Sequence, residues 1–238
     1  TRELHKKNSL LELLNQEKNQ FLGMAAHDLR KPIGLVITYS DFLLDEAAQD
    51  LDKEHVRFLN TIQKSCLFMK RLVDDFLDVS AIEAGKFELD IQPGYLSDAL
   101  EQCLRLNNLQ AGKKRVALDV NTQANMPRIL MDAPKIEQVI TNLVSNAIEH
   151  TFPDTVVRID ITHYNGAVNF CVEDKGPGIA PEELNRLFKP FEKTSTKKTG
   201  GEKSTGLGML ITRKIIEAHE GKIWVESALG KGTRVFFS

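Results

Sequence analysis

Apolar residues recur every three or four positions between residues 21 and 46, which is the spacing of one face of a helix. The stripe is apolar at all positions but one and consists of Leu22, Ala25, Ala26, Leu29, Ile33, Val36, Ser40 and Leu43. At about 100° per residue, His27 lies about 150° from the middle of this stripe. A helix that buries the stripe therefore holds the imidazole toward water, beside Asp28. Pro32 lies inside the pattern and is expected to kink the helix.

A second helical pattern runs from Asp52 to Glu83, after a short polar link. Its apolar positions also recur at three and four, and they are Val56, Leu59, Ile62, Cys66, Met69, Val73, Phe76 and Leu77. Two such helices form a hairpin, and no third layer follows in the sequence to cover their apolar faces. We therefore expect the hairpin, residues 21–84, to pair with a second copy as a four-helix bundle, which makes the protein a homodimer.

Residues 1–20 carry a few leucines among Lys, Glu, Asn and Gln. The spacing of Leu4, Leu11 and Leu14 predicts a short coiled coil that leads into the His27 helix. An ordinary amphipathic helix start explains these residues equally well.

After Gly85, which is expected to close the second helix, strands and helices follow one another irregularly. The predicted strands are 87–91, 115–120, 128–131, a pair around the turn at 165–166, 222–227 and 233–237, and the predicted helices are 96–110, 133–150 and 207–219. The lack of a regular strand–helix–strand repeat favours an α/β sandwich with helices on one face. The predicted fold class is therefore α+β, with a helical hairpin followed by an α/β sandwich over residues 87–238.

The bulk composition narrows the class of protein. The 238 residues are 42% apolar and 27% charged, with a formal net charge of −2, so nothing favours nucleic acid or a membrane surface as a partner. Cys66, Cys103 and Cys171 are widely spaced and odd in number, which predicts buried, reduced thiols and a cytoplasmic location. Because the sequence begins at Thr1 rather than Met, we expect a fragment, such as the cytoplasmic part of a membrane-bound sensor.

The residues around His27 carry candidate chemistry. A lone His on a helix is most often a solvated side chain, but here an acid follows it and a proline interrupts the pattern. The segment resembles the phosphoacceptor box of sensor histidine kinases, and the matching residues are His27, Asp28, Leu29, Arg30 and Pro32. Lys31 departs from the small polar residue that is usual there, and we expect little phosphatase activity as a result. The resemblance implies that His27 is phosphorylated while Asp28 holds its Nδ1–H.

Two segments of the second half suggest a ligand site. Asn142 and Asn146 lie four apart along one edge of the buried face of the 133–150 helix, although such amides are also common surface residues. Asp174 ends a strand and precedes a glycine-rich run, which permits close backbone approach to a ligand but also fits a simple turn. The residues of that run that we select are Gly176, Gly178 and Ile179.

A third segment is the glycine-rich entry into the last helix. It consists of Thr205, Gly206, Leu207 and Gly208, which follow Ser204. Free backbone N–H groups and the helix dipole favour phosphate at such a place. The segment matches neither a P-loop nor a dinucleotide fingerprint.

In this order and spacing, the three segments resemble the nucleotide-binding domain shared by histidine kinases, DNA gyrase and the Hsp90 chaperones. The likeness extends from about residue 19 to the C-terminus. It implies bound ATP and Mg²⁺, with Asn146 coordinating the metal, Asp174 holding the adenine amino group and Thr233 supporting it through a water. It also implies phosphate contacts from the 206–208 backbone, and a lid over residues 192–204 in which Lys193 meets the γ-phosphate.

One position separates the functional classes. Gyrase and chaperone relatives carry a water-activating Glu where Asn142 stands, and Asn cannot act as a base, which suits a kinase. Glu149 stands where the kinases usually carry a Lys that faces the phosphates, so either Glu149 turns away or another cation replaces that Lys. We interpret the chain as a sensor histidine kinase core that phosphorylates His27 with ATP and passes the group to an Asp of a response regulator. The alternative is a degenerate, non-catalytic ATP-binding scaffold.

Overall fold

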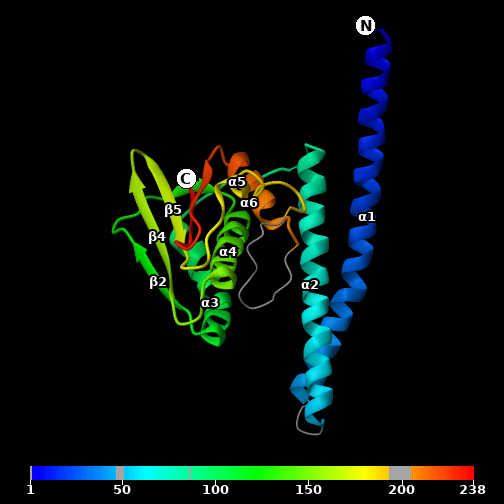
Figure 1. The fold of residues 1–238 in the computed structure, drawn as a ribbon. Coiled ribbons are helices and arrows are strands. Elements are labelled where there is room, and N and C mark those ends of the chain that lie inside the picture. The colour runs from blue at the N-terminus through cyan, green and yellow to red at the C-terminus, as the bar shows by residue number, and fades with distance from the viewer. Residues whose placement is uncertain (1, 47–50, 86, 193–204) are drawn as a thin grey trace. The chain divides into compact units, whose positions relative to one another are not determined.

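The computed structural model describes residues 2–46, 51–85, 87–192 and 205–238. The chain forms two compact units, Thr1–Phe87 and Glu88–Ser238. Figure 1 shows the helical N-terminal unit in blue and cyan and the mixed C-terminal unit in green to red. Each unit is described by itself. Among the described residues, no helix combines the length and the apolar character needed to cross a bilayer.

The N-terminal unit is a hairpin of two long helices, α1 (Arg2–Glu46) and α2 (Lys53–Glu83). α2 begins where it does because the Asp52 carboxylate accepts hydrogen bonds from the backbone N–H groups of Glu54 and His55. It ends at Glu83, and Gly85 follows the C-cap Ala84 with a φ of 64°, the left-handed conformation expected there. α1 continues through Pro32 without a break, and its axis bends within the hairpin (Figure 1). α1 also includes residues 2–20, where the coiled-coil lead-in is predicted. Most side chains of this segment lie outside the described set, so the coiled coil stays a prediction.

The hairpin leaves much of its apolar surface uncovered. Ala26, Ser40, Cys66 and Ser80 are buried. Large apolar side chains on both helices are exposed instead, namely Met24, Leu29, Leu35, Val36, Tyr39, Phe42, Leu43, Phe58, Ile62, Leu67 and Met69. A single copy of this hairpin therefore lacks a full core.

The C-terminal unit is built on a five-stranded sheet with the strand order β2-β4-β5-β7-β6. The strands are β2 (Ala117–Thr122), β4 (Val156–Tyr164), β5 (Ala167–Glu173), β6 (Ile223–Ser227) and β7 (Thr233–Phe237). Only the β2–β4 pair is parallel; the other neighbours are antiparallel. A separate two-stranded sheet pairs β1 (Gln92–Gly94) with β3 (Ile129–Met131).

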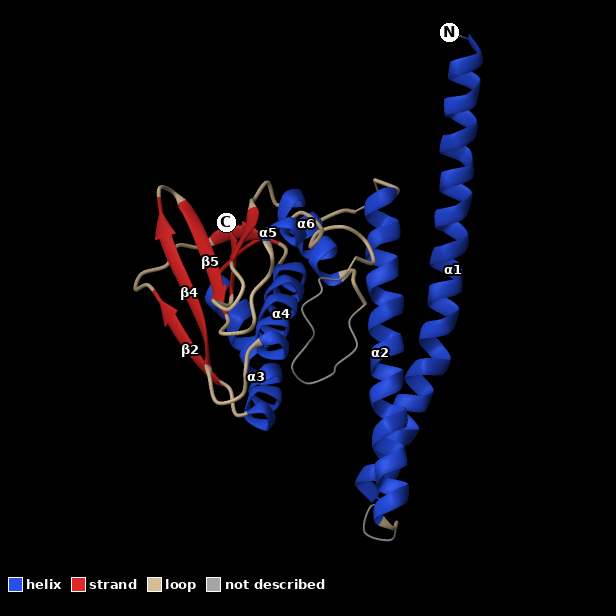
Figure 2. Ribbon diagram, viewed as in Figure 1, coloured by secondary structure: helices blue, strands red, loops and turns tan. Residues whose placement is uncertain are grey.

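Helices α3 (Leu96–Lys114), α4 (Ala133–His150) and α6 (Gly208–Ala218) cover one face of the larger sheet (Figure 2). The core between the layers contains fully buried side chains from both, including Ile140, Leu143, Phe170 and Ile215. The predicted α+β architecture, with a helical hairpin and a one-sided α/β sandwich, is thus confirmed. A short helix, α5 (Pro181–Leu184), was not predicted.

The predicted strand at residues 87–91 is wrong, because residues 87–91 have no regular secondary structure and β1 begins at Gln92. The backbone N–H of Asp90 donates to Oδ2 of Asp132 at 3.0 Å, so a side chain takes the place of a strand partner. The other predicted elements are present, with ends shifted by a few residues at most.

The prediction for the cysteines is confirmed in its main point. All three are free thiols; Cys66 and Cys103 are buried and Cys171 is half-buried. Burial raises the pKa of the Cys171 thiol to about 12. The thiols are therefore packed as small apolar groups rather than poised to react.

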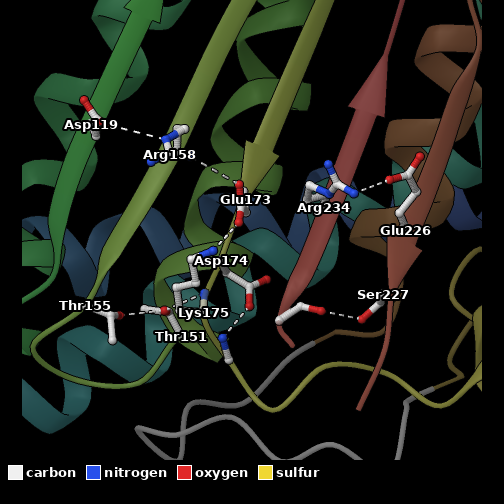
Figure 3. A network of polar contacts seen from close by, with 12 residues as sticks. Asp119, Thr151, Thr155, Arg158, Glu173, Asp174, Lys175, Glu226, Ser227 and Arg234 are labelled. Atoms are coloured by element: carbon white, nitrogen blue, oxygen red, sulfur yellow. Dashed lines mark hydrogen bonds and ion pairs between the residues drawn. The ribbon is translucent and has the colours of Figure 1, made fainter. Parts of the chain in front are cut away.

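A row of charges crosses the open face of the larger sheet (Figure 3). Strand register places its five members side by side in the order Asp119, Arg158, Glu173, Arg234 and Glu226. Ion pairs join Arg158 to Asp119 at 3.5 Å and to Glu173 at 3.8 Å, and Arg234 to Glu226 at 2.7 Å. The signs alternate across all five strands, so every cross-strand neighbour in the row is an opposite charge, which favours this register.

The packing of Phe170 generates a prediction about stability. Its ring is fully buried and stacks on Phe237 with centroids 4.8 Å apart. Phe170→Ala should therefore lower the unfolding free energy of the C-terminal unit by about 3–5 kcal/mol. Urea unfolding followed by fluorescence of Trp224, the chain's one tryptophan, measures this unit selectively. Tyr164→Ala, at a side chain that is 72% exposed, is the matched control and should change the value by less than about 0.5 kcal/mol. Equal losses for both variants would contradict the assigned core.

Candidate functional site

His27 lies on the outward face of α1. Its side chain is 60% exposed and that of Asp28 is 80% exposed, whereas the preceding Ala26 is buried. The imidazole Nδ1 is 3.3 Å from Oδ1 of Asp28. With Nδ1 carrying the proton, this contact leaves the Nε2 lone pair facing water. The orientation expected from the helical pattern is therefore present.

Arg30, in the same part of α1, binds α2 through its side chain, a role that the sequence pattern did not indicate. Nε and Nη2 of Arg30 donate to Oδ1 of Asp74 at 3.0 Å and 2.5 Å. Arg30 is one helical turn after His27 and its partner is 44 positions away, so no local pattern could have identified the pair. The contact connects the His27 segment to its neighbouring helix.

In the C-terminal unit, Asn142 lies on α4 with its side chain against the start of α6. Its Nδ2 donates to Oγ1 of the buried Thr212 at 2.8 Å. A Cβ at Gly208 would lie 2.5 Å from Oδ1 of Asn142, so a larger residue at the start of α6 would displace the Asn142 side chain. Asn142 and Gly208, predicted in separate motifs, are thus in direct contact.

Asn146 follows one turn later on α4 and is half-buried. Its side-chain amide makes no hydrogen bond to any other residue within the described ranges. No group of three or more His, Cys, Asp or Glu among the described residues could hold a metal by itself. A divalent ion at Asn146 would therefore have to take most of its ligands from phosphate and water.

Asp174 is the most perturbed carboxyl group of the candidate site. It lies just beyond β5 and is only 6% exposed, and its Oδ1 accepts from the backbone N–H of Gly176 at 2.7 Å. Burial raises the pKa of the Asp174 carboxyl to about 6, although the hydrogen bonds it accepts act in the opposite direction. A buried carboxylate with remaining acceptor capacity is suited to bind an N–H donor.

The loop after Asp174 requires glycine for reasons internal to the protein. Gly178 has φ of 73°, and a Cβ there would lie 2.0 Å from the carbonyl oxygen of Ala228. The backbone N–H of Gly230 also donates to the carbonyl of Pro177 at 2.7 Å. Close packing against the β6–β7 turn therefore accounts for this glycine without any ligand.

Two hydroxyl groups that the sequence analysis missed hold this loop. At its start, Oγ1 of the buried Thr151 accepts from the backbone N–H of Lys175 at 3.1 Å, and it lies 2.8 Å from Oγ1 of Thr155 (Figure 3). At its end, Oγ of Ser227 accepts from the backbone N–H of Ile179 at 2.9 Å. Their partners lie 24 and 48 positions away, and both hydroxyls belong to residue types that are common in turns, so the sequence carried no distinguishing signal.

Thr233 begins β7 beside this loop. Its carbonyl accepts from the backbone N–H of Asp174 at 2.9 Å, and its Oγ1 lies 2.9 Å from Oγ of Ser227. The structure therefore joins Asp174 and Ile179, which were selected from one segment, to Thr233, which was selected through the resemblance and lies far along the chain, in one hydrogen-bonded group.

The entry to α6 is held by backbone turns. Oγ1 of Thr205 accepts from the N–H of Leu207 at 3.2 Å, and the carbonyl of Gly206 accepts from the N–H of Phe191 at 3.0 Å. Leu207 is buried and anchors the segment in the core. Lys193 and the rest of the predicted lid, 193–204, lie outside the described residues, and the described Glu192 pairs with Arg186.

Glu149 is buried, with 7% of its surface exposed. A cation lies at the same end of α4, because Nζ of Lys114 donates to the carbonyl oxygens of Ile148 and Glu149, each at 2.6 Å. Lys114 therefore caps the C-terminus of the helix that carries both asparagines.

Comparisons with known proteins agree with this division of the chain. Residues 17–85 match the family model of the His Kinase A (phospho-acceptor) domain. Residues 131–238 match that of the histidine kinase-, DNA gyrase B- and HSP90-like ATPases. The cell-division control histidine kinases PdhS of Brucella canis and Brucella abortus are each 32% identical over 234 residues, 94% of this chain. The chain spans 23% of the length of these curated relatives, less than a quarter.

Solved structures give the same result. Full-length ShkA in complex with AMPPNP is 26% identical with a TM-score of 0.73, over 92% of this chain and 45% of that one. The catalytic domain of histidine kinase ThkA is 31% identical with a TM-score of 0.55, over 63% of this chain and 94% of that domain. ThkA in complex with response regulator TrrA is 25% identical with a TM-score of 0.62, over 99% and 66%. From its phospho-acceptor hairpin to its ATPase-type sandwich, the chain belongs to the histidine kinase family.

Proposed function

We propose that this chain is the dimerisation and catalytic core of a sensor histidine kinase. ATP bound by residues 88–238 phosphorylates His27, and the phosphoryl group then passes to an Asp of a response regulator. The observation that carries the proposal is the exposed His27, held through Nδ1 by Asp28 at 3.3 Å, in the same chain as the buried acceptor Asp174. His27 supplies the nucleophile, and Asp174 supplies a hydrogen-bond acceptor for the adenine base.

The transfer needs little from the protein beyond orientation and charge. The Nε2 lone pair of His27 forms a bond to the γ-phosphorus while the bond from that phosphorus to the β,γ-bridging oxygen breaks, and ADP leaves with those electrons. The Nδ1 proton stays on the ring, whose developing positive charge is stabilised by the Asp28 carboxylate.

Each cluster of the proposed nucleotide site has one proposed role. Asp174 accepts a hydrogen bond from the exocyclic amine of adenine, with Thr233 supporting it through a water, and the 206–208 backbone faces the phosphates. The amide of Asn146 makes no hydrogen bond within the described part of the chain and offers a hard oxygen of the kind that Mg²⁺ takes, so this residue fits the metal. Mg²⁺, when bound, neutralises phosphate charge.

The absence of a base at Asn142 favours transfer to His27 over hydrolysis. Its amide is neutral, cannot take a proton from water, and is already committed to Thr212 at 2.8 Å. ATP held in such a site keeps its γ-phosphate until a better nucleophile arrives. No specific observation favours the scaffold alternative, since Glu149 is buried and Lys114 provides a cation at the same helix end.

The partners we propose are a second copy of this chain and a response regulator. The exposed apolar side chains of α1 and α2 support pairing of two hairpins as a four-helix bundle. The structure of ThkA with the response regulator TrrA has been solved, and the match to ThkA covers 99% of the present chain. We expect this signalling to take place in the cytoplasm.

The first test of the proposal is phosphorylation of His27. Incubation with ATP radiolabelled at the γ-phosphate should label the wild-type chain with an acid-labile, base-stable bond, as expected of a phosphoramidate. His27→Gln should abolish the label, because only this one of the six histidines combines an outward position on α1 with an adjacent acid. His163→Gln, on β4, is the control and should keep it. An unlabelled wild-type chain would support the scaffold alternative, and label that persists in His27→Gln would contradict the assignment.

The second test uses the raised pKa of Asp174. Because burial raises the pKa of this carboxyl to about 6, the site carries its negative charge only above that pH. ADP affinity, measured by calorimetry, should therefore rise between about pH 5 and about pH 7 and then level off. The ionised carboxyl also destabilises the empty fold, so the unfolding free energy without ADP should increase as the pH falls through about 6.

Asp174→Asn separates these two effects. Its Oδ1 can still accept from Gly176, but its NH₂ then meets the donor amine of adenine, so ADP binding should become weak and independent of pH. The variant should nevertheless be more stable than wild type at neutral pH. Glu88→Gln, at an exposed carboxyl before β1, should leave both quantities unchanged. Undiminished ADP binding by Asp174→Asn would contradict the base-binding role.

The third test separates the metal from the base. Asn146→Ala should weaken ADP binding by about tenfold or more in Mg²⁺ but hardly at all in EDTA, because it removes a metal ligand. Asn108→Ala, on the exposed side of α3, provides the matched control. Equal losses with and without Mg²⁺ would show that Asn146 acts through something other than the metal.

A further inference from the structure

The hydroxyl of Ser227, at the end of β6, has three hydrogen-bond partners from two other chain segments. Its Oγ donates to the carbonyl of Gly232 at 2.8 Å, accepts from the backbone N–H of Ile179 at 2.9 Å, and lies 2.9 Å from Oγ1 of Thr233. Figure 3 shows this side chain beside the start of β7, close to the Asp174 loop. A hydroxyl has one proton and two lone pairs, so these contacts use its entire capacity.

The chemistry of the three partners decides which group donates in each hydrogen bond of Ser227. The carbonyl of Gly232 can only accept, so it takes the single proton of Ser227, and the amide of Ile179 can only donate. In the contact between the two hydroxyls, Thr233 must therefore be the donor. The Thr233 side chain is thus held in one rotamer by Ser227, although a hydroxyl on a strand end would otherwise rotate among three staggered positions.

Two of the three partners belong to the nucleotide site. Ile179 ends the loop that starts at Asp174, and the carbonyl of Thr233 accepts from the N–H of Asp174 at 2.9 Å. Ser227 therefore joins the 174–179 loop to the start of β7. These two segments have to keep a fixed spacing for Asp174 and Thr233 to bind the same adenine ring.

We infer that Ser227 is a positioning residue for adenine recognition, which acts by orienting the Thr233 hydroxyl and by holding the Ile179 end of the loop. The inference rests on the proposed function and adds a residue to it that has no direct contact with the base. Ser227 makes no bond with the nucleotide phosphates in this scheme, so its effect should depend on the identity of the base.

The test is a double-mutant cycle on nucleotide binding to the full chain, measured by calorimetry with ADP and with inosine diphosphate, which lacks the exocyclic amine. Ser227→Ala should weaken ADP binding about three- to tenfold, the range of one lost hydrogen bond. It should weaken inosine diphosphate binding less, so the ratio of the two affinities should fall. Ser227→Thr keeps the hydroxyl and should restore ADP binding to near the wild-type value.

The cycle is completed with Thr233→Val. If Ser227 acts through Thr233, adding Ser227→Ala to Thr233→Val should weaken ADP binding little further. Ser97→Ala, whose hydroxyl contacts only Asp98 among the described residues, is the matched control and should leave the affinity ratio at its wild-type value. Should Ser227→Ala fail to fold, Ser227→Cys provides a side chain of similar size with a weaker donor and acceptor, and it should show a smaller shift in the same direction.

The possible failures are distinct. A wild-type chain that binds neither nucleotide would overturn the proposed function, and this inference with it. A wild-type chain that binds ADP, combined with additive losses in the cycle and an unchanged affinity ratio, would overturn only the role of Ser227. That result would make Ser227 a residue that stabilises the fold without influencing the base.

Discussion

The candidate site depends on keeping one carboxyl group, that of Asp174, out of water. Burial makes the charged form costly, which is the main reason why the pKa of this group is raised to about 6. The surrounding loop is held by backbone contacts to Gly176 and Thr233 and by the hydroxyls of Thr151 and Ser227. These contacts leave the carboxylate with acceptor capacity that the protein itself does not use. A site of this kind trades stability of the empty fold for affinity toward a ligand that brings its own donor.

The two units differ in how far each can bury its own apolar side chains. The sandwich buries its apolar side chains within one chain, from Ile140 on α4 to Phe170 on β5. The hairpin cannot do so, because two helices provide two apolar faces and no third layer, and side chains such as Phe42 and Phe58 remain exposed. The nucleotide unit therefore has a core of its own, whereas the unit that carries His27 needs a further surface to complete one.

Much of the fold could be predicted because its signals are local. The bounds of α4 agree with the prediction since Asp132 caps its first turn and apolar residues recur at helical spacing up to His150. The turn at Asn165–Gly166 likewise predicted the β4–β5 hairpin. The segment 87–91 was misassigned because its apolar alternation suggests a strand, whereas its Asp90 amide is bonded to a side chain 42 positions away.

The same difference between local and long-range signals decides which residues of the candidate site could be predicted. The motif residues could be selected from local spacing and family resemblance, and the structure brings Asn142 to Gly208 and Asp174 to Thr233. The residues that hold them, Thr151 and Ser227, could not be selected, because a Ser or Thr near a turn has no distinctive spacing and its partner is known only after folding. The pair of Arg30 with Asp74 was missed for the same reason.

The row of alternating charges on the open face of the sheet has an odd number of members, so it begins and ends with the same sign. Its outermost residues are Asp119 on β2 and Glu226 on β6, which are the two edge strands. Two molecules that approached through their sheet edges at this row would bring carboxylates together, whichever edges met. Like charges opposite one another disfavour the pairing of strands, and charged edges are a common protection against it. The arrangement that favours the strand register inside one molecule thus also disfavours pairing of its sheet edges with those of a second molecule.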